Sequence, residues 1–114
     1  MNEFKRNIKI YENYFWDFYN AQDAKVQQKI DWTITLLQTT KIVPEKFFKH
    51  LTGTRGLWEI RVSLNNGIYR IFCFFDEGNL VILLSGFKKK TQKTPQIEIK
   101  KAVQLKKEYY DSKK

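Results

Sequence analysis

The sequence predicts an α+β domain in which helices pack against an antiparallel sheet. Apolar residues follow a helical repeat early in the chain, alternate with a period of two in the middle, and return to helical spacing near the end. The length of 114 residues is near the common size of one compact domain, so residues 1–114 are expected to form a single domain. The expected order of elements is β-α-α-β-β-β-α.

The N-terminal part is expected to supply one strand and two helices. Residues 4–11 can form the strand, and the aromatic-rich residues 12–20 the first helix. Over residues 23–40, apolar side chains recur at spacings of four, four and three, which is one stripe of an amphipathic helix. Trp16 and Trp32 are expected to pack in the core or to contact a partner protein. The stripe consists of Val26, Ile30, Ile34 and Leu37.

The middle of the chain is expected to form an antiparallel meander. A short turn of helix is predicted at residues 45–51, before the strands begin. Residues 57–64 and 68–75 flank Asn66-Gly67, which is the strongest short hairpin signal available. Residues 80–87 are expected to form the third strand.

A last helix follows Thr94. This threonine is expected to cap the helix, and Pro95 to occupy its first turn, where the missing N–H costs nothing. Its apolar side is expected to comprise Ile99, Ala102, Val103 and Tyr110.

The positive charge is concentrated at the C-terminal end. The formal net charge is +9, and residues 88–114 contain ten lysines against three acidic residues. Such a distribution indicates a polyanionic partner, which can be nucleic acid, an acidic protein or an anionic membrane face. A solvated helix that keeps the protein in solution is the alternative.

The remaining composition argues for a cytoplasmic protein without a cofactor. No apolar run is long enough to span a membrane and no export leader opens the chain, so no membrane partner is expected. The single Cys73 lies in an apolar run and is expected to be a buried, inert thiol. One His, one Cys and no carboxylate pair at ligand spacing predict no metal site.

Two arginines interrupt the apolar strands. With a two-residue turn at Asn66-Gly67, Arg61 and Arg70 become diagonal neighbours on one sheet face, together with Glu59 and Ser63. A charge in an apolar strand is costly unless it is paired or used. One interpretation is a structural ion pair between Glu59 and one arginine. The other, which we favour because one carboxylate cannot easily neutralise two guanidinium groups, is a phosphate clamp.

A cationic segment follows the third strand. A turn at residues 76–79 would place Ser85 opposite Arg70 and Phe87 on the same face. The lysine-rich residues 88–94 then leave the sheet beside Phe87. Lysines next to an exposed aromatic ring are typical of single-stranded nucleic-acid binding. With arginines and lysines, RNA can be cleaved without a metal, because the substrate's own 2′-OH serves as the nucleophile.

Three sequence blocks together resemble a known toxin family. The blocks are residues 56–62 (GLWEIRV), 69–72 (YRIF) and 84–95 (LSGFKKKTQKTP). They resemble the phage-derived HigB-like branch of the RelE/ParE toxin superfamily. The resemblance implies a RelE-like fold and a type II toxin–antitoxin module. It also implies metal-independent cleavage of mRNA on the translating ribosome, which leaves a cyclic phosphate, and a HigA-like antitoxin with a helix-turn-helix domain.

The resemblance also assigns roles to individual residues. Arg61 and Arg70 correspond to the strand residues that bind and activate the scissile phosphate. The lysines Lys88, Lys89 and Lys90 match the basic segment after the last strand.

The proton carrier is left open. Several RelE-type ribonucleases have a tyrosine or histidine near the end of the last strand, where this chain has Ser85 and Phe87. A phenylalanine can stack on a base but cannot transfer a proton. A lysine of residues 88–90 or His50 can take that role, and His50 can equally be a surface or cap residue. The residues expected to bind RNA without reacting are Phe87, Lys90, Gln92 and Lys93.

Three functions remain as alternatives: a ribosome-dependent endoribonuclease, a ParE-like poison of DNA gyrase, and a nonenzymatic RNA-binding module. An antitoxin can neutralise the endoribonuclease with an acidic segment over the arginine face, or by clamping the helices and blocking access to the ribosome.

Overall fold

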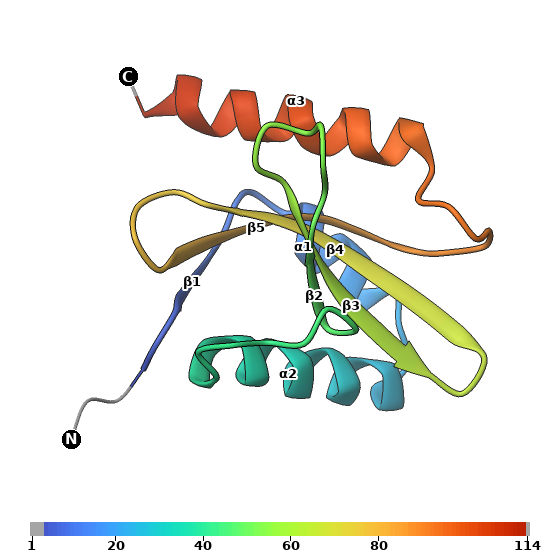
Figure 1. The fold of residues 1–114 in the computed structure, drawn as a ribbon. Coiled ribbons are helices and arrows are strands. Elements are labelled where there is room, and N and C mark those ends of the chain that lie inside the picture. Colours follow the sequence, from blue (N-terminus) through green and yellow to red (C-terminus); the bar gives the residue numbers. More distant parts are fainter. Residues whose placement is uncertain (1–3, 114) are drawn as a thin grey trace.

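The computed structural model describes residues 4–113 and shows a five-stranded sheet with helices on both faces (Figure 1). The spatial order of the strands is β1-β5-β4-β3-β2. Helices α1 and α2 cover one face of the sheet, and α3 crosses the other. The predicted α+β class is confirmed. The elements are β1 (Asn7–Ile10), α1 (Tyr14–Asn20), α2 (Ala24–Thr39), β2 (Phe48–His50), β3 (Trp58–Leu64), β4 (Gly67–Phe75), β5 (Leu80–Lys88) and α3 (Gln96–Ser112). None of the helices in residues 4–113 is long and apolar enough to cross a membrane.

The sheet differs from the prediction in two ways. Strand β1 pairs with β5 in parallel, so the sheet is mixed rather than wholly antiparallel. The helical turn predicted at residues 45–51 is wrong. Only one turn forms, as the N–H groups of Phe47 and Phe48 donate to the carbonyl of Pro44, and β2 then pairs with β3. The ring of Phe48 stacks on Trp58 at a centroid distance of 4.5 Å, so tertiary packing overrides the local pattern.

Each sheet face has its own core cluster. The α2 side contains Ile30, Val62 and Cys73, and burial raises the pKa of the Cys73 thiol, as expected for an inert buried group. The other cluster lies beneath α3 and contains Phe74 and Leu105.

The two tryptophans of the N-terminal helices are not core residues. Trp16 is 43% exposed and Trp32 is 49% exposed, so the expectation that they pack in the core is wrong. In α2 the inward stripe is occupied by Val26, Ile30 and Leu37, which leaves Trp32 beside it. These rings are therefore free to contact another molecule.

The last helix begins one residue later than predicted. Pro95 is the N-cap residue and makes no side-chain cap, while the hydroxyl of Thr94 donates to Glu59 Oε2 at 2.7 Å. The predicted cap at Thr94 is therefore wrong, because a buried carboxylate competes for the hydroxyl. Val103 and Tyr110, predicted to be apolar contacts, are more than a third exposed. The buried residues of α3 are Ala102, Leu105 and Tyr109.

The hairpin register is shifted by two positions from the prediction. Leu64 pairs with Gly67, and the turn is made by Asn65-Asn66, with Asn65 in the left-handed region at φ 54°. As a result Arg61 lies directly opposite Arg70 instead of diagonally. A shift of two keeps every side chain on its predicted face.

An extra residue in β5 changes the second register. Ile71 pairs with Gly86 and Cys73 with Leu83, so β5 carries one additional residue opposite Phe72. Phe87 consequently lies opposite Arg70, where Ser85 was expected. The bulge moves the end of β5 along the arginine strand while keeping Phe87 on the arginine face.

Close contact between α1 and β5 depends on Gly86. A Cβ atom at this position would lie 2.5 Å from Phe18 Cδ2. We expect Gly86→Ala to lower the free energy of unfolding by about 1–3 kcal/mol, because the ring must move away. Urea denaturation followed by circular dichroism measures the change. In a Phe18→Leu background the same substitution should cost less, and an equal cost in both backgrounds would contradict this account.

Candidate active site

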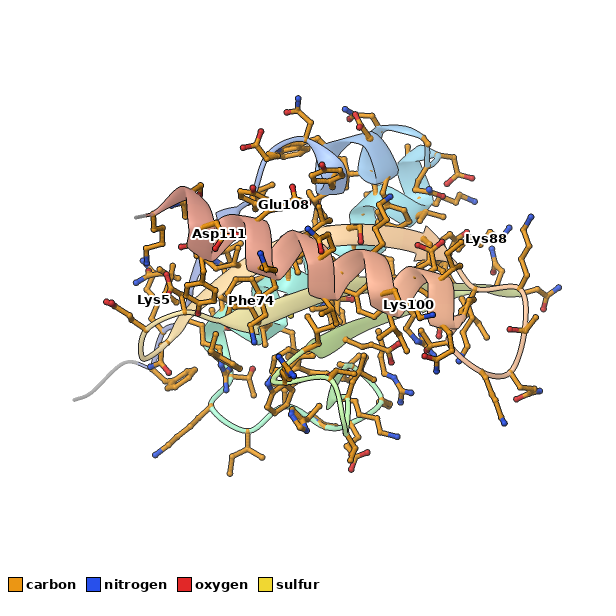
Figure 2. All side chains as sticks on the ribbon, turned by 90° about the horizontal axis from the view of Figure 1, so that it is seen from above. Lys5, Phe74, Lys88, Lys100, Glu108 and Asp111 are labelled. Atoms are coloured by element: carbon orange, nitrogen blue, oxygen red, sulfur yellow. The ribbon has the colours of Figure 1, made fainter. Side chains whose placement is uncertain are left out.

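The candidate site lies on the α3 side of the sheet, where α3 leaves β3 uncovered. Helix α3 packs mainly on β5 and β4. Figure 2 looks onto this side: Lys88 and the loop after it lie beyond the N-terminal end of α3, near Lys100. Arg61 and Arg70 are cross-strand partners here, one on β3 and one on β4. The sheet register alone thus brings two guanidinium groups together.

A single buried carboxylate faces both arginines. Glu59 is 1% exposed, and its Oε1 lies 3.4 Å from Arg61 Nε and 3.7 Å from Arg70 Nε. Its Oε2 accepts the hydrogen bond from Thr94. The alternative of an ion pair with one arginine is therefore incomplete, since the carboxylate is shared. Two positive charges against one negative charge leave the cluster with an excess that an anion can neutralise.

Arg70 is held in an environment that disfavours its charge. Its exposure is 8%, and burial, together with the neighbouring Arg61, lowers the pKa of the Arg70 guanidinium, which nevertheless stays protonated. Its Nη1 donates to the carbonyl of Tyr69 at 3.1 Å, but its buried Nε has no hydrogen-bond partner. That nitrogen lies 3.7 Å from Glu59 Oε1, beyond hydrogen-bond distance, so the charge of Arg70 is neutralised there only by a long ion pair.

Lys89 completes the positive cluster. Its backbone N–H donates to Ile68 at 2.7 Å and so extends the strand pairing by one position. Burial lowers the pKa of the Lys89 ammonium, the nearby charges of Arg70, Arg61 and Lys49 lower it further, and the carboxylate of Glu59 partly opposes them. A lysine of this kind is closer to releasing its proton at neutral pH than an exposed one.

A hollow opens beside Arg70 and Lys89. Its volume is about 500 Å³, and it is lined largely by polar and cationic groups. Lys90 and Gln92, both predicted to bind RNA, line this hollow, as does Thr91. The space and its lining suit a phosphate with part of its sugar better than an apolar ligand.

Other predicted residues lie elsewhere. The Phe87 ring stacks on Phe72 at a centroid distance of 5.6 Å and is only partly accessible. Lys88 pairs with Tyr69 and lies over its ring, on the α2 side of the sheet. The ring of His50 packs against Trp58, also on the α2 side. Lys93 is exposed in the loop before α3.

The structure therefore joins some of the predicted residues and separates others. Arg61, Arg70 and Lys89 form one cluster, whereas Lys88 and His50 are not brought to it. Two contributors were missed as site residues: Thr94, taken for a helix cap, and Lys49, the cross-strand partner of Glu59. Neither had a signal in the sequence, because both contacts join distant segments and Lys49 fell in a predicted helical turn.

No His, Cys, Asp or Glu cluster able to hold a metal occurs among residues 4–113. The groups that the site does present are two guanidinium groups, the ammonium groups of Lys89 and Lys90, and the amide of Gln92. This set can bind a phosphodiester and stabilise additional negative charge on it.

The shared carboxylate supplies a testable prediction. We expect Glu59→Gln to lower the free energy of unfolding by about 3 kcal/mol, because the buried Arg70 and the partly buried Arg61 lose their counter-charge. Thr94→Val, which removes one hydrogen bond, should cost only about 1 kcal/mol. Thermal unfolding measures both. Inorganic phosphate should raise the Tm of Glu59→Gln more than that of the wild type, and equal shifts would contradict an anion site at the arginines.

Comparison with known proteins identifies the family of this chain. No curated protein matches the sequence. Residues 17–107 match the family described as phage derived protein Gp49-like (DUF891), a family of RelE/HigB-like toxins associated with toxin–antitoxin modules. The match runs from within α1 to within α3 and includes the whole cationic cluster. The chain therefore belongs to the Gp49-like family of phage-derived toxins.

Proposed function

We propose that this chain is the toxin of a type II toxin–antitoxin module, in the HigB-like branch, and that it cleaves mRNA on the ribosome without a metal. One observation carries the proposal: Arg61 and Arg70 lie directly opposite each other, share the single carboxylate of Glu59, and adjoin Lys89. Such a cluster offers an under-neutralised site for a phosphodiester. Membership of a toxin family makes the phosphate of RNA the most consistent substrate.

The proposed reaction is an internal transesterification. The 2′-oxygen of the nucleotide before the cut forms a bond to phosphorus as the bond between phosphorus and the 5′-oxygen breaks. A base takes the proton of the 2′-OH, and an acid gives a proton to the departing 5′-oxygen, leaving a 2′,3′-cyclic phosphate and a 5′-hydroxyl. Arg61 and Arg70 would stabilise the charge that develops on the phosphoryl oxygens. DNA, which lacks the 2′-OH, is not cleaved by this route.

Lys89 is the best-placed candidate for proton transfer. It is the lysine whose pKa is lowered beside the two arginines, and it lines the hollow next to Arg70. A lowered pKa increases the neutral amine that can act as a base near neutral pH. Of the other candidates, Lys88 and His50 have their side chains on the opposite sheet face, while Lys90 lines the same hollow but is exposed.

The proposed partners are the ribosome and an antitoxin. Cationic side chains along α3, such as the exposed Lys100, Lys101 and Lys107, offer contacts for ribosomal RNA phosphates. A HigA-like helix-turn-helix antitoxin would neutralise the toxin. The toxin would act in the cytoplasm, where translation occurs.

A nonenzymatic RNA-binding module is the second candidate. Phe87, at the end of the last strand, has no titratable group, and its ring is packed against Phe72 rather than free in the site. Binding without cleavage would then follow from the same positive cluster. Cleavage assays separate the two candidates directly.

Replacement of Arg70 tests the proposed nuclease. In cell-free translation, wild-type protein should produce cuts phased with codons, which primer extension maps on the mRNA. We expect Arg70→Ala to reduce the cleavage rate by about 10²–10³-fold, because a donor to the developing charge is lost. Arg55→Gln, in an exposed loop, is the matched control and should cut like the wild type.

The outcomes distinguish the candidates. Intact mRNA with oligonucleotide binding that depends on Arg70 would favour the nonenzymatic module. Intact mRNA with accumulation of cleaved DNA–gyrase complexes would instead assign the ParE-like activity. Either result would refute the nuclease.

The pH dependence of cleavage tests Lys89. If its neutral amine is the base, the single-turnover rate should rise with pH and level off below the pKa of an exposed lysine, because burial and the arginines lower the pKa of Lys89. Lys89→Arg keeps the charge but does not deprotonate in this range, so the rising limb should disappear while binding of uncleavable RNA persists. An unchanged profile in Lys89→Arg would remove Lys89 from proton transfer.

A further inference from the structure

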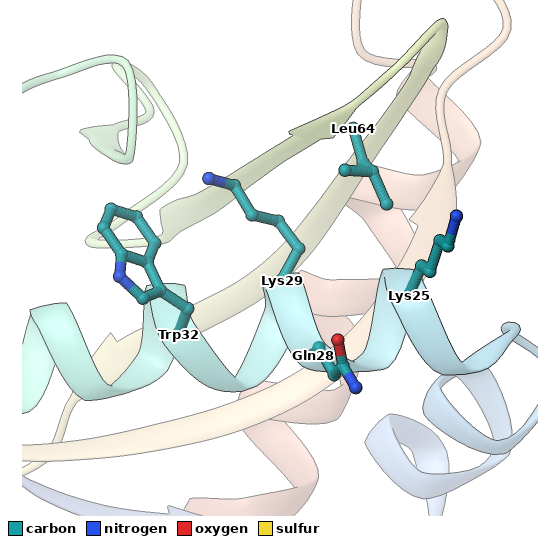
Figure 3. A pocket seen from close by; sticks show the side chains of 5 residues that line it. All are labelled: Lys25, Gln28, Lys29, Trp32 and Leu64. Atoms are coloured by element: carbon teal, nitrogen blue, oxygen red, sulfur yellow. The ribbon is translucent and has the colours of Figure 1, made fainter.

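An exposed tryptophan lies beside a row of cations on α2. Trp32 is 49% exposed, Lys29 Nζ lies over its ring at 4.2 Å from the centroid, and the ring of Phe47 packs against it in an edge arrangement at a centroid distance of 5.4 Å. Figure 3 shows Trp32, Lys29 and Lys25 reaching from α2 around a hollow whose far side is formed by Leu64 at the end of β3. The hollow has a volume of about 420 Å³. A large ring is thus held in place while much of its surface remains accessible.

A second hollow lies next to the first at the edge of the sheet. Its volume is about 250 Å³, and its lining includes Lys29, Lys46, Arg61 and Ser63. It shares Lys29 with the Trp32 hollow and Arg61 with the candidate active site. Shared lining residues therefore lead from the Trp32 hollow to the arginines, along the 45–47 segment whose Lys46 and Phe47 line the second hollow.

The path exists because β2 is short. Strand β2 pairs with β3 from Trp58 to Ile60, and one further backbone hydrogen bond follows, from the N–H of Arg61 to the carbonyl of Phe47. Beyond that point, Arg61 can reach the sheet edge, where its Nη1 approaches the carbonyl of Glu45 at 3.3 Å. One guanidinium group thus belongs both to the arginine cluster and to the edge of the sheet.

The charge along this path has a single sign. The charged side chains that line the two hollows are Lys25, Lys29, Lys46 and Arg61, and no acidic side chain is among the lining residues. Asp31, the acidic residue of α2, accepts a hydrogen bond from Tyr19 instead. Cations spaced along a groove with one accessible aromatic ring match a single-stranded nucleic acid, whose phosphates follow the cations and whose base stacks on the ring.

We propose that the strand held at Arg61 and Arg70 continues around the free edge of β3 and stacks an unpaired base on Trp32, so that this path binds RNA flanking the cut. The inference rests on the proposed function, since the arginine cluster must hold a phosphodiester for the strand to continue from it. An acidic segment of a protein partner is the competing occupant of the same cations. Binding of such an acidic segment in place of RNA is one of the outcomes that the experiment distinguishes.

The test measures binding of 2′-O-methyl RNA, which cannot be cut by its own 2′-oxygen, so the result does not depend on catalysis. Two labelled oligonucleotides are compared by fluorescence anisotropy, one of about 4 and one of about 16 nucleotides, the range of single-strand site sizes on small domains. The variants are Trp32→Ala, Trp32→Phe, Lys29→Gln and Arg70→Ala. Trp16→Ala is the matched control, because Trp16 is similarly exposed but lies on α1.

The proposal expects an effect that depends on length. Trp32→Ala should weaken binding of the long oligonucleotide by about 5- to 100-fold and leave the short one unchanged, because only the long strand reaches the ring. Trp32→Phe should restore most of the affinity. Lys29→Gln should reduce the slope of log affinity against log salt by about 0.7, as expected for one lost phosphate contact.

Three results would overturn the path. Equal affinity of Trp32→Ala and Trp16→Ala for the long strand would remove Trp32 from RNA binding. If Trp32→Ala weakens binding of the short and the long oligonucleotide equally, Trp32 belongs to a separate binding site and does not bind the continuation of the strand. Unchanged RNA binding by Trp32→Ala, combined with loss of neutralisation by the antitoxin, would assign the surface to a protein. Arg70→Ala tests the proposed function separately. If this variant binds the short oligonucleotide as tightly as the wild type, the arginine cluster does not hold the phosphodiester.

Discussion

The buried carboxylate of Glu59 is the constraint on which the candidate site depends. A charged group at 1% exposure is stable only with opposite charges beside it, and Glu59 has Arg61 two residues along β3 and Arg70 on the neighbouring β4. The same carboxylate accepts a hydrogen bond from Thr94 and so ties down the segment between β5 and α3. One side chain therefore orients both guanidinium groups and fixes the loop that carries Lys89.

The fold provides a place for this cluster by covering the two sheet faces unequally. Helices α1 and α2 pack closely on one face, where Gly86 allows the ring of Phe18 to approach the backbone of β5. On the other face α3 lies mainly over β5 and β4 and is anchored at its end by Tyr109 and Lys113, which both donate to Asp76. The face of β3 stays open, and its edge is free beyond the short β2.

Incomplete neutralisation links this architecture to the proposed chemistry. Because two arginines share one carboxylate, the site keeps a positive charge, and burial makes that charge strong by limiting the water around it. The lowered pKa of Lys89 has the same origin. A bound phosphate would relieve this repulsion. The excess positive charge of this cluster therefore favours anion binding and lowers the stability of the free protein.

The sequence by itself determined the α+β class, nearly all the elements and the face on which Arg61 and Arg70 lie, because alternation and helical spacing are local properties that survive a register shift of two. Only the tertiary structure decided which lysine lies beside the arginines, that the hydroxyl of Thr94 donates a hydrogen bond to Glu59, and that Trp32 is exposed. The bulge in β5 and the pairing of β2 with β3 set those positions. Both arise from packing between distant segments, which no local pattern encodes.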